Sequence, residues 1–393
     1  MEVTTNFLIN ARCFAKGTSL ASAYARRKRI KNMGSKSAAL KLVDSRFPNL
    51  DDARKSEIVD DLVLMARKFH YGYDEYFYYH FMDRTMEDRL SFVSDMVRCD
   101  FVRTLNKAVN QHVFDDKGNC ARRFAKFYHR DFCVVHKPLI GKLNTINIRS
   151  GIRDVAVGDG GRWGGQIADL QCFIDKHNRF IVKPVAGSCG KGVKIYNASD
   201  FANVSDLIKE LLDSYCVGWN GGFIAEEVIV QDKQMASLHP KSVNTVRLTT
   251  IKYDESKVDV IHPFMRIGRG GKVVDNGGAG GLLADIDYST GKIFACMDEN
   301  ATVFEKHPDS GLDIIGFKIP HWEDALNLAK ELALVVKGNR YTGWDLALTD
   351  TGWVMVEGNP MGQFVGWQIP SQKGFMPEAQ QILKELNKRP LRY

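Results

Sequence analysis

Apolar positions in the first third of the chain recur at helical spacing. Residues 56–69 and 87–105 carry apolar side chains three or four positions apart, as on one face of an α-helix. In the first segment these are Ile58, Leu62, Met65 and Phe69. An aromatic stretch at residues 71–81 lies between the two segments. It could form a platform for a sugar or a base, but such clusters more often pack between helices. The pattern predicts mostly helical structure up to about residue 130.

After residue 130 the apolar runs become short and are bounded by Gly, Asn and Asp, which is typical of strands. The predicted strands are 132–135, 180–182, 223–230, 245–251, 258–264, 282–286, 346–348 and 353–356. Helical spacing returns at 201–212 and 322–336, and residues 377–386 predict a closing helix. The chain therefore reads as an α+β body behind a helical N-terminal region.

Composition changes this picture only at the N-terminus. The 393 residues are 44% hydrophobic and 26% charged, as in an ordinary globular protein. The net charge is 54 − 47 = +7, and the basic excess is concentrated in residues 3–43, most densely at 26–31. Such a tract can meet phosphates, nucleic acid or an anionic membrane surface, or it can be a solvated helix face.

The location of the protein is also an expectation from composition. No apolar run is long enough to span a membrane, and the N-terminus has no secretory signal core. The eight cysteines are scattered without a CxxC pair, which argues against a zinc ribbon or a redox dithiol. We expect reduced thiols in a cytoplasmic protein.

A strand that ends in a lysine is followed by a glycine-rich loop. Phe180–Pro184 contains Lys183, and residues 187–192 read Gly-Ser-Cys-Gly-Lys-Gly. Glycines let backbone N–H groups close over phosphate oxygens, and lysine adds a point charge. The spacing is neither that of a Walker loop nor GxGxxG, and an ordinary hairpin turn is the alternative interpretation.

The segment 343–360 predicts a β-hairpin with carboxylates at its base. A three-residue loop, Asp350-Thr351-Gly352, would pair Thr349 with Trp353 and place Asp345 opposite Glu357. Asn359 lies two residues further on and would share their face. Oxygen ligands of this kind suit Mg²⁺ at a phosphate site. The alternative is a solvated pair of acids.

Two further segments have weaker interpretations. The apolar strand 223–230 contains Glu226 and Glu227, which could border a nucleotide base or lie on a solvated strand edge. His239 precedes Pro240, and we interpret it as a turn or packing residue rather than a general base.

Together these pieces resemble the ATP-grasp superfamily, in its order of lysine and glycine loop, adenine-linker acids, and then Asp…Glu-x-Asn. The segments 238–249 (LHPKSVNTVRLT) and 266–287 (Arg266 to Asp287) look like the sugar-transfer-associated ATP-grasp family, which is related to α-L-glutamate ligases and linked to polysaccharide biosynthesis. The resemblance covers roughly residues 70–370.

The resemblance implies a role for each matched position around ATP. Lys183 would touch the α- and β-phosphates under a mobile flap formed by residues 187–192. The flap residues that would contact nucleotide are Gly187, Ser188, Gly190, Lys191 and Gly192. Glu226, Glu227 and Val228 would line the adenine, Val228 through its backbone. A second lysine is expected early in a helix, and Lys117 fits better than its competitor, Lys137.

The resemblance also implies the metal and transfer groups. Asp345, Glu357 and Asn359 would hold one or two Mg²⁺, with Mn²⁺ as a substitute. Many relatives have an arginine where this chain has Gly343, so Arg247 or Arg266 must supply the positive charge for the transfer. Asn276 and the loop 277–281 would border the acceptor pocket.

The implied architecture is two α+β subdomains that clamp ATP. Its expected parts are a helical N-terminal region with the basic tract (1–110), an N-terminal or central subdomain (111–180), a lid (181–228) and a C-terminal subdomain with the magnesium and acceptor sites (229–393).

The implied activity is ATP-dependent amide formation through an acyl phosphate. An amino acid or amine would be joined to a carboxylate-bearing sugar or sugar nucleotide. The basic tract would contact a membrane surface or a glycan assembly complex, and we expect no nucleic acid. The alternatives are an ATP-grasp phosphotransferase and a non-catalytic nucleotide-binding subunit.

Overall fold

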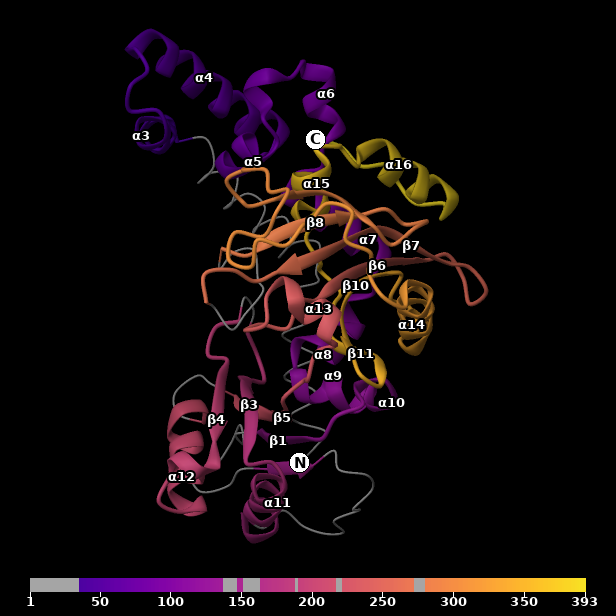
Figure 1. Cartoon of the computed structure of the whole chain (residues 1–393). Coiled ribbons are helices and arrows are strands. Elements are labelled where there is room, and N and C mark those ends of the chain that lie inside the picture. The colour runs from indigo at the N-terminus through magenta and orange to yellow at the C-terminus, as the bar shows by residue number, and fades with distance from the viewer. Residues whose placement is uncertain (1–34, 137–146, 151–162, 188–189, 217–220, 272–279) are drawn as a thin grey trace.

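The computed structural model describes residues 35–136, 147–150, 163–187, 190–216, 221–271 and 280–393. The basic residues at 26–31 lie outside this part. From top to bottom in Figure 1, the N-terminal helices are followed by one β-sheet, a group of short helices and a second β-sheet.

The N-terminal helices are α3 (Lys36–Arg46), α4 (Asp52–Phe69), α5 (Tyr73–Tyr78), α6 (Met86–Ser91) and α7 (Asp95–Leu105), with a 3₁₀ turn η1 (Phe81–Asp83). Among them, α3, α4, α6 and α7 begin at side-chain caps, whereas the N-cap of α5 is Gly72. The segment 87–105, expected to be helical, is divided because Ser94 caps a new helix through the backbone N–H of Val97. The aromatic cluster is core, as predicted, since Tyr71, Tyr76, Tyr79 and Phe81 are almost fully buried.

Sheet A is antiparallel and has the strand order β2-β1-β5-β3-β4. Its strands are β1 (Phe132–His136), β2 (Asn147–Ser150), β3 (Arg179–Pro184), β4 (Lys194–Asn197) and β5 (Gly222–Glu227). The helices α11 (Trp163–Lys176) and α12 (Val204–Tyr215) pack on its lower face in Figure 1. The expected division at residues 180 and 181 falls inside β3, so the segments on both sides of it share this sheet.

The opposite face of sheet A carries the short helices. These are η2 (Ala108–Asn110), α8 (His112–Asp115), α9 (Lys117–Arg123) and α10 (Ala125–Tyr128). Ala121 of α9 and Tyr128 of α10 pack on Val134 and Ile224 of the sheet. Strand residues alternate between the two faces, so Lys183 and Glu226 lie on this inner face with Ile224.

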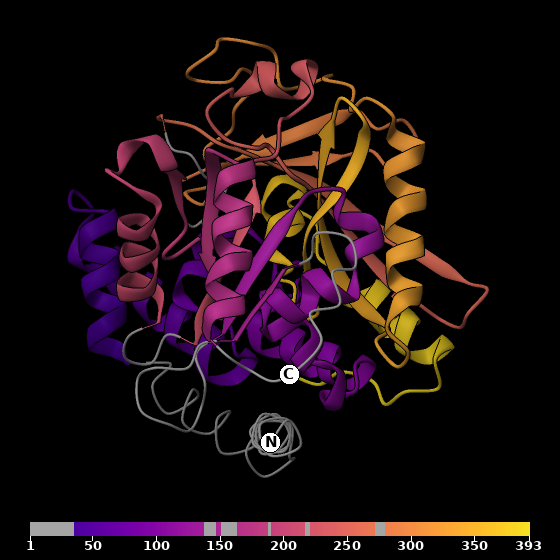
Figure 2. The same ribbon diagram turned by 90° about the horizontal axis from the view of Figure 1, so that it is seen from below.

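Sheet B is antiparallel and has the strand order β11-β10-β6-β7-β8-β9. Its strands are β6 (Val246–Lys252), β7 (Val258–Ile267), β8 (Leu282–Ile286), β9 (Ile293–Met297), β10 (Tyr341–Thr349) and β11 (Gly352–Asn359). The helix α14 (Trp322–Val335) covers one face, as Figure 2 shows from below. The other face meets the N-terminal helices and α15 (Val365–Ser371), beside α16 (Met376–Glu385).

The hairpin β10–β11 has the predicted pairing at its base but not at its turn. Thr349 pairs with Gly352, not with Trp353, because the loop has two residues instead of three. A β-bulge then shifts the register: Leu346 faces Met355, whereas Asp345 faces Glu357. The extra residue of the bulge is Val356, and it compensates for the shorter loop. The Asp345–Glu357 pairing is therefore confirmed, although the predicted turn was wrong.

Candidate active site

The first cluster of the candidate site surrounds Asp345, on the face of sheet B that α14 does not cover. Asp345 is 1% exposed and lies opposite Arg247 of β6. Arg247 donates to both carboxylate oxygens, with Nη2 2.9 Å from Oδ2, and Arg266 Nη2 lies 2.8 Å from Oδ2. Burial alone would raise the pKa of Asp345, but the two guanidinium groups outweigh it and lower this pKa below its ordinary value.

Gly343 explains how Arg247 reaches this position. A Cβ atom on Gly343 would lie 2.9 Å from Cδ and 3.3 Å from Nη1 of Arg247, so the arginine stem occupies the space that a side chain would fill. The guanidinium of Arg247, supplied from β6, therefore lies beside Gly343 of β10.

Glu357 and Asn359 complete this cluster. Asn359 Nδ2 donates to Asp345 Oδ2 at 3.2 Å, and Glu357 is paired with Asp345 across the hairpin. Glu357 retains 38% side-chain exposure and lies 3.6 Å from Lys117 Nζ. In the described part of the chain no hydrogen bond ends on the Glu357 carboxylate or on the Asn359 amide oxygen. These oxygens therefore have lone pairs available for a cation.

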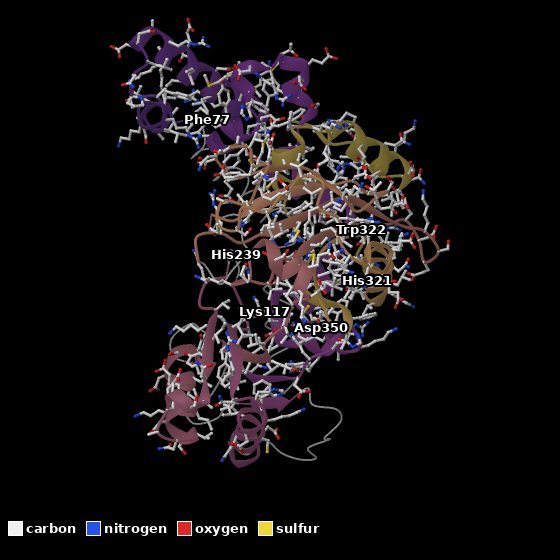
Figure 3. The ribbon with its side chains drawn as sticks, in the orientation of Figure 1. Phe77, Lys117, His239, His321, Trp322 and Asp350 are labelled. Carbon is white, nitrogen blue, oxygen red and sulfur yellow. The ribbon has the colours of Figure 1, made fainter. Side chains whose placement is uncertain are left out.

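Lys117 joins the flap to the hairpin. It is the first residue of α9, whose N-cap Asp116 accepts from Asn119 N at 2.8 Å. Its backbone N–H donates to Val185 O at 2.8 Å, and its Nζ donates to Gly187 O, also at 2.8 Å. Figure 3 shows Lys117 between the two sheets. The competing Lys137 lies outside the described residues.

Lys183 is held by a buried ionic network on sheet A. Its Nζ lies 2.9 Å from Glu226 Oε2, and the Glu226 side chain is 1% exposed. Arg130 Nη2 donates to the same oxygen at 3.0 Å, and Tyr128 Oη donates to Oε1 at 3.1 Å. Burial opposes ionisation of Glu226, but Lys183 and Arg130 lower its pKa to about 2. The Glu226 carboxylate is therefore charged, and its ion pair with Lys183 orients the lysine.

Arg130 extends this network to sheet B. Its Nη1 donates to Met355 O at 2.7 Å and its Nη2 to Val356 O at 3.5 Å. Lys183 is therefore connected through Glu226 and Arg130 to the residue that precedes Glu357. Neither Arg130 nor Tyr128 was identified from the sequence. Both lie in a segment without strand or loop motifs, and their contacts depend on the pairing of distant strands.

The other residues predicted to line the adenine lie at or just after the end of β5. Glu227 points to the opposite face of the sheet from Glu226, where its Oε2 accepts from Asp131 N at 3.2 Å. It lies close to Asp131 and His177 there. Only the backbone of Glu227 can therefore face the side of Lys183. Val228 follows the strand and is half-buried.

Glycines of the flap adopt backbone conformations that other residues rarely adopt. Gly187, Gly190 and Gly192 have φ angles of 132°, 68° and 75°. Lys191 is exposed between the last two. Ser188 in the flap and Asn276 in the acceptor loop lie outside the described residues.

The candidate site as a whole has an excess of positive charge. Its ionic groups are Lys117, Arg130, Lys183, Arg247, Arg266, Glu226, Asp345 and Glu357. Five are cations and three are carboxylates. The site therefore suits a polyanion such as a triphosphate.

Residues 96–384 match the model of the family described as sugar-transfer associated ATP-grasp. The chain belongs to this family, and its two sheets with their helices form the α+β ATP-grasp fold.

Solved structures with a similar fold have low sequence identity. N5-carboxyaminoimidazole synthetase from Staphylococcus aureus, complexed with ADP, is 11% identical with a TM-score of 0.38, over 66% of this chain and 48% of that one. D-alanine–D-alanine ligase from Bacillus anthracis is 12% identical with a TM-score of 0.37, over 72% and 67%. Biotin carboxylase from Campylobacter jejuni is 12% identical with a TM-score of 0.40, over 74% and 50%. The match spans about half the length of the first of these proteins. No curated protein matches the chain.

Among the described residues, no helix is both long and apolar enough to cross a membrane.

Proposed function

We propose that the chain is an ATP-dependent carboxylate–amine ligase. The observation that carries this proposal is the position of the Lys117 side chain. Its Nζ donates to Gly187 O in the flap and lies 3.6 Å from Glu357 of the hairpin. A triphosphate between the flap and the hairpin would meet Lys117 and Lys183 on one side and the Asp345 cluster on the other. The basic excess of the site offsets its charge.

The proposed reaction has two steps. A substrate carboxylate attacks the γ-phosphorus of ATP and forms an acyl phosphate, and ADP leaves. An amine then attacks the acyl carbon, a proton is lost from its nitrogen, and phosphate leaves to give an amide. Lys183 and Lys117 would neutralise the ADP oxygens, while Arg247 and Arg266 would face the transferred phosphoryl group. Positioning and charge neutralisation do most of the work that such a reaction requires.

The oxygen donors of the hairpin fit a hard divalent cation. Asp345, Glu357 and Asn359 would hold one or two Mg²⁺, with Mn²⁺ as a substitute, and the metal would neutralise charge on the phosphate oxygens. Asp345 is already paired with Arg247 and Arg266, so Glu357 and Asn359 offer the accessible lone pairs.

The family description, sugar-transfer associated ATP-grasp, supports a sugar as one of the substrates. We infer a carboxylate-bearing sugar or sugar nucleotide and an amino acid or other amine, used in surface polysaccharide biosynthesis in the cytoplasm. The basic N-terminal tract would contact the membrane surface or a glycan assembly complex.

The test is release of ADP and phosphate from ATP and Mg²⁺ with a matrix of uronic-acid sugars and amino acids, with products analysed by mass spectrometry. A pair that stimulates release and gives a product of their summed mass less one water supports the ligase. A phosphorylated acceptor without an amide would show a phosphotransferase. Nucleotide binding without turnover across the matrix would favour the non-catalytic alternative.

A further inference from the structure

The chain leaves sheet B through a tight turn that starts at Asn359. This residue ends β11, the edge strand of the described sheet, and pairs there with Gly343. The turn covers residues 359–362 and is closed by Gly362 N, which donates to Asn359 O at 3.1 Å. Because β11 has a neighbouring strand on one side only, the position of Asn359 depends on what holds the turn.

Side-chain donors satisfy the other three carbonyl oxygens of this turn. They are Asn106 Nδ2 at 2.9 Å from Pro360 O, Arg98 Nη1 at 2.7 Å from Met361 O, and Tyr341 Oη at 2.9 Å from Gly362 O. Carbonyl groups that are shielded from water require such partners. Arg98 lies in α7 and Asn106 directly follows this helix, more than 250 residues before the turn. The helix α7 therefore holds the turn from outside sheet B.

Asn106 joins both strands of the hairpin at the end where Asn359 lies. Its Nδ2 donates to Tyr341 O at 2.8 Å as well as to Pro360 O. Its Oδ1 accepts from Arg340 N and Tyr341 N, both at 2.9 Å. A planar amide has two N–H donors and one oxygen, so these four bonds use its full capacity and fix its orientation. One side chain thus sets the spacing between the start of β10 and the end of β11.

Arg98 contacts the same turn from the buried side of α7. It is 6% exposed. Its Nε and Nη2 donate to Asp95 Oδ1 at 2.9 Å and 2.7 Å, while its Nη1 donates to Met361 O. The carboxylate of Asp95 therefore holds one edge of the guanidinium, and the other edge reaches the turn.

The turn also limits the space around the guanidinium of Arg247. A Cβ atom on Gly362 would lie 3.5 Å from Arg247 Nη1 and 3.2 Å from Tyr341 Oη, so the turn packs closely against both groups. Arg247 is an ionic partner of Asp345, and Asn359 Nδ2 donates to the same carboxylate. A shift of the turn would therefore disturb two partners of Asp345 at once.

We propose that Arg98 and Asn106 are positioning residues of the ATP site, which keep Asn359 in place as a ligand of the divalent cation. This inference rests on the proposed ligase function. Both residues act through the turn and would contact neither the nucleotide nor the metal. The extent of the family match supports the proposal, because the match begins at residue 96, within α7. The helix α7 is then a functional part of the ATP site.

The test is isothermal titration of the full chain with the ATP analogue AMP-PNP, once with excess Mg²⁺ and once with EDTA. The ratio of the two affinities gives the contribution of the metal. We expect R98K and N106D to lower this ratio by about ten-fold, the lower end of the loss when a group that orients a metal ligand is changed. The affinity in EDTA should not change, because Lys117 and Lys183 remain in place.

Each variant retains part of the original contact. A lysine at position 98 keeps the positive charge beside Asp95 but lacks the second arm that reaches the turn. An aspartate at position 106 keeps an acceptor for the start of β10 but loses the donor to Pro360 O. The matched control is N110A. Asn110 Nδ2 donates to Lys337 O at 2.6 Å, so it joins the segment after α7 to the segment before β10 without touching the turn. N110A should leave both affinities unchanged.

A second measurement asks whether Asn106 acts through Asn359. In an Asn359→Ala background, N106D should leave the remaining ratio unchanged, because the ligand that it positions is gone. A further loss in that background overturns the inference. Equal ratios in the wild type, R98K and N106D also overturn it, as does an equal loss of both affinities, which would mark a general structural role. Failure of AMP-PNP to bind the wild type instead contradicts the proposed ligase function, so the two failures are distinguishable.

Discussion

The two carboxylates of the hairpin differ in how far the protein already neutralises them. Asp345 is buried between two guanidinium groups, whereas Glu357 is partly exposed with Lys117 3.6 Å away. Removing the charge of Glu357 should therefore affect ligand binding and catalysis more than folding.

Glu357→Gln is expected to lower ADP release by ~10²–10³, the usual effect of losing one electrostatic contact in an active site. The thermal midpoint of unfolding should stay within a few degrees of the wild type. Coupled-enzyme ADP release and calorimetry measure the two quantities. The matched control is Asp350→Asn in the turn of the same hairpin, labelled in Figure 3, which should change neither. Near-native turnover of Glu357→Gln would show that Glu357 is not part of the active site.

Asp345→Asn should also stop turnover, but at a cost in stability. It leaves Arg247 and Arg266 without their carboxylate, and loss of one partner from a buried ion pair costs ~3–5 kcal/mol. Urea denaturation of the variant should show this loss as a lower midpoint. If the free energy of unfolding is unchanged, the two arginines are not paired with Asp345 as the structure shows.

The Glu226 carboxylate predicts a pH dependence of stability. Its folded-state pKa is lowered to about 2, below the ordinary value of 4.5. A lowered pKa contributes stability that is present above the unfolded-state pKa and is lost as the pH falls through the folded-state value. The free energy of unfolding of the wild type minus that of Glu226→Gln should thus be constant above about pH 5 and decline from there toward pH 2. A difference that does not vary over this range would contradict the charged pair.

At the scale of elements, the strand β10 shows why a glycine is needed at position 343. Arg247 occupies the space beside Gly343, with its Cδ 2.9 Å from the position of a Cβ atom. Gly343→Ala should therefore displace the guanidinium from Asp345 and lower turnover about ten-fold or more. In an Arg247→Ala background the same change should have little further effect, because nothing remains to displace. A double-mutant cycle of turnover measures this coupling. Additive effects of the two changes would refute it.

The elements themselves were largely predictable from local pattern. Short apolar runs bounded by turn residues predicted β1, β3, β5, β6, β7, β8 and both strands of the hairpin, and helical periodicity predicted α4, α12, α14 and α16. The turn of the hairpin was predicted one residue too long because loop length and a bulge can compensate for each other. The predicted pairing of Asp345 with Glu357 was still correct, because a two-residue loop plus one bulge residue leaves as many residues unpaired as a three-residue loop does.

The ionic partners could not be predicted from local pattern. Arg130 follows a short helix without periodicity, and it meets Glu226 only because β1 lies beside β5 in the sheet. The pairing of Asp345 with Arg247 likewise depends on β10 lying beside β6, about a hundred residues away along the chain. The direction in which Glu226 and Glu227 point also depends on the pleat of β5, which places their side chains on opposite faces of sheet A.

At the scale of the molecule, the bulge in β11 connects the two sheets. A bulge removes a residue from the regular ladder, and the carbonyl of the extra residue, Val356, accepts from Arg130 together with that of Met355. The same guanidinium binds Glu226 in sheet A and lies 3.6 Å from the ring centroid of Tyr128. Arg130 is therefore a buried link between the sheet that carries Lys183 and the hairpin that carries Glu357.

Arg130→Met should loosen this link. The variant leaves two carbonyls without their donor and Glu226 with Lys183 as its remaining cation, so the free energy of unfolding should fall by ~3–5 kcal/mol. In the wild type, Glu226→Gln takes the carboxylate from both Arg130 and Lys183, whereas in the Arg130→Met background it takes it from Lys183 alone. Glu226→Gln should therefore destabilise the Arg130→Met background less than it destabilises the wild type. Urea denaturation of the four proteins measures this difference. If Glu226→Gln destabilises both backgrounds equally, Arg130 does not neutralise Glu226, and the connection between Lys183 and the hairpin would have to run through Lys117 and the flap instead.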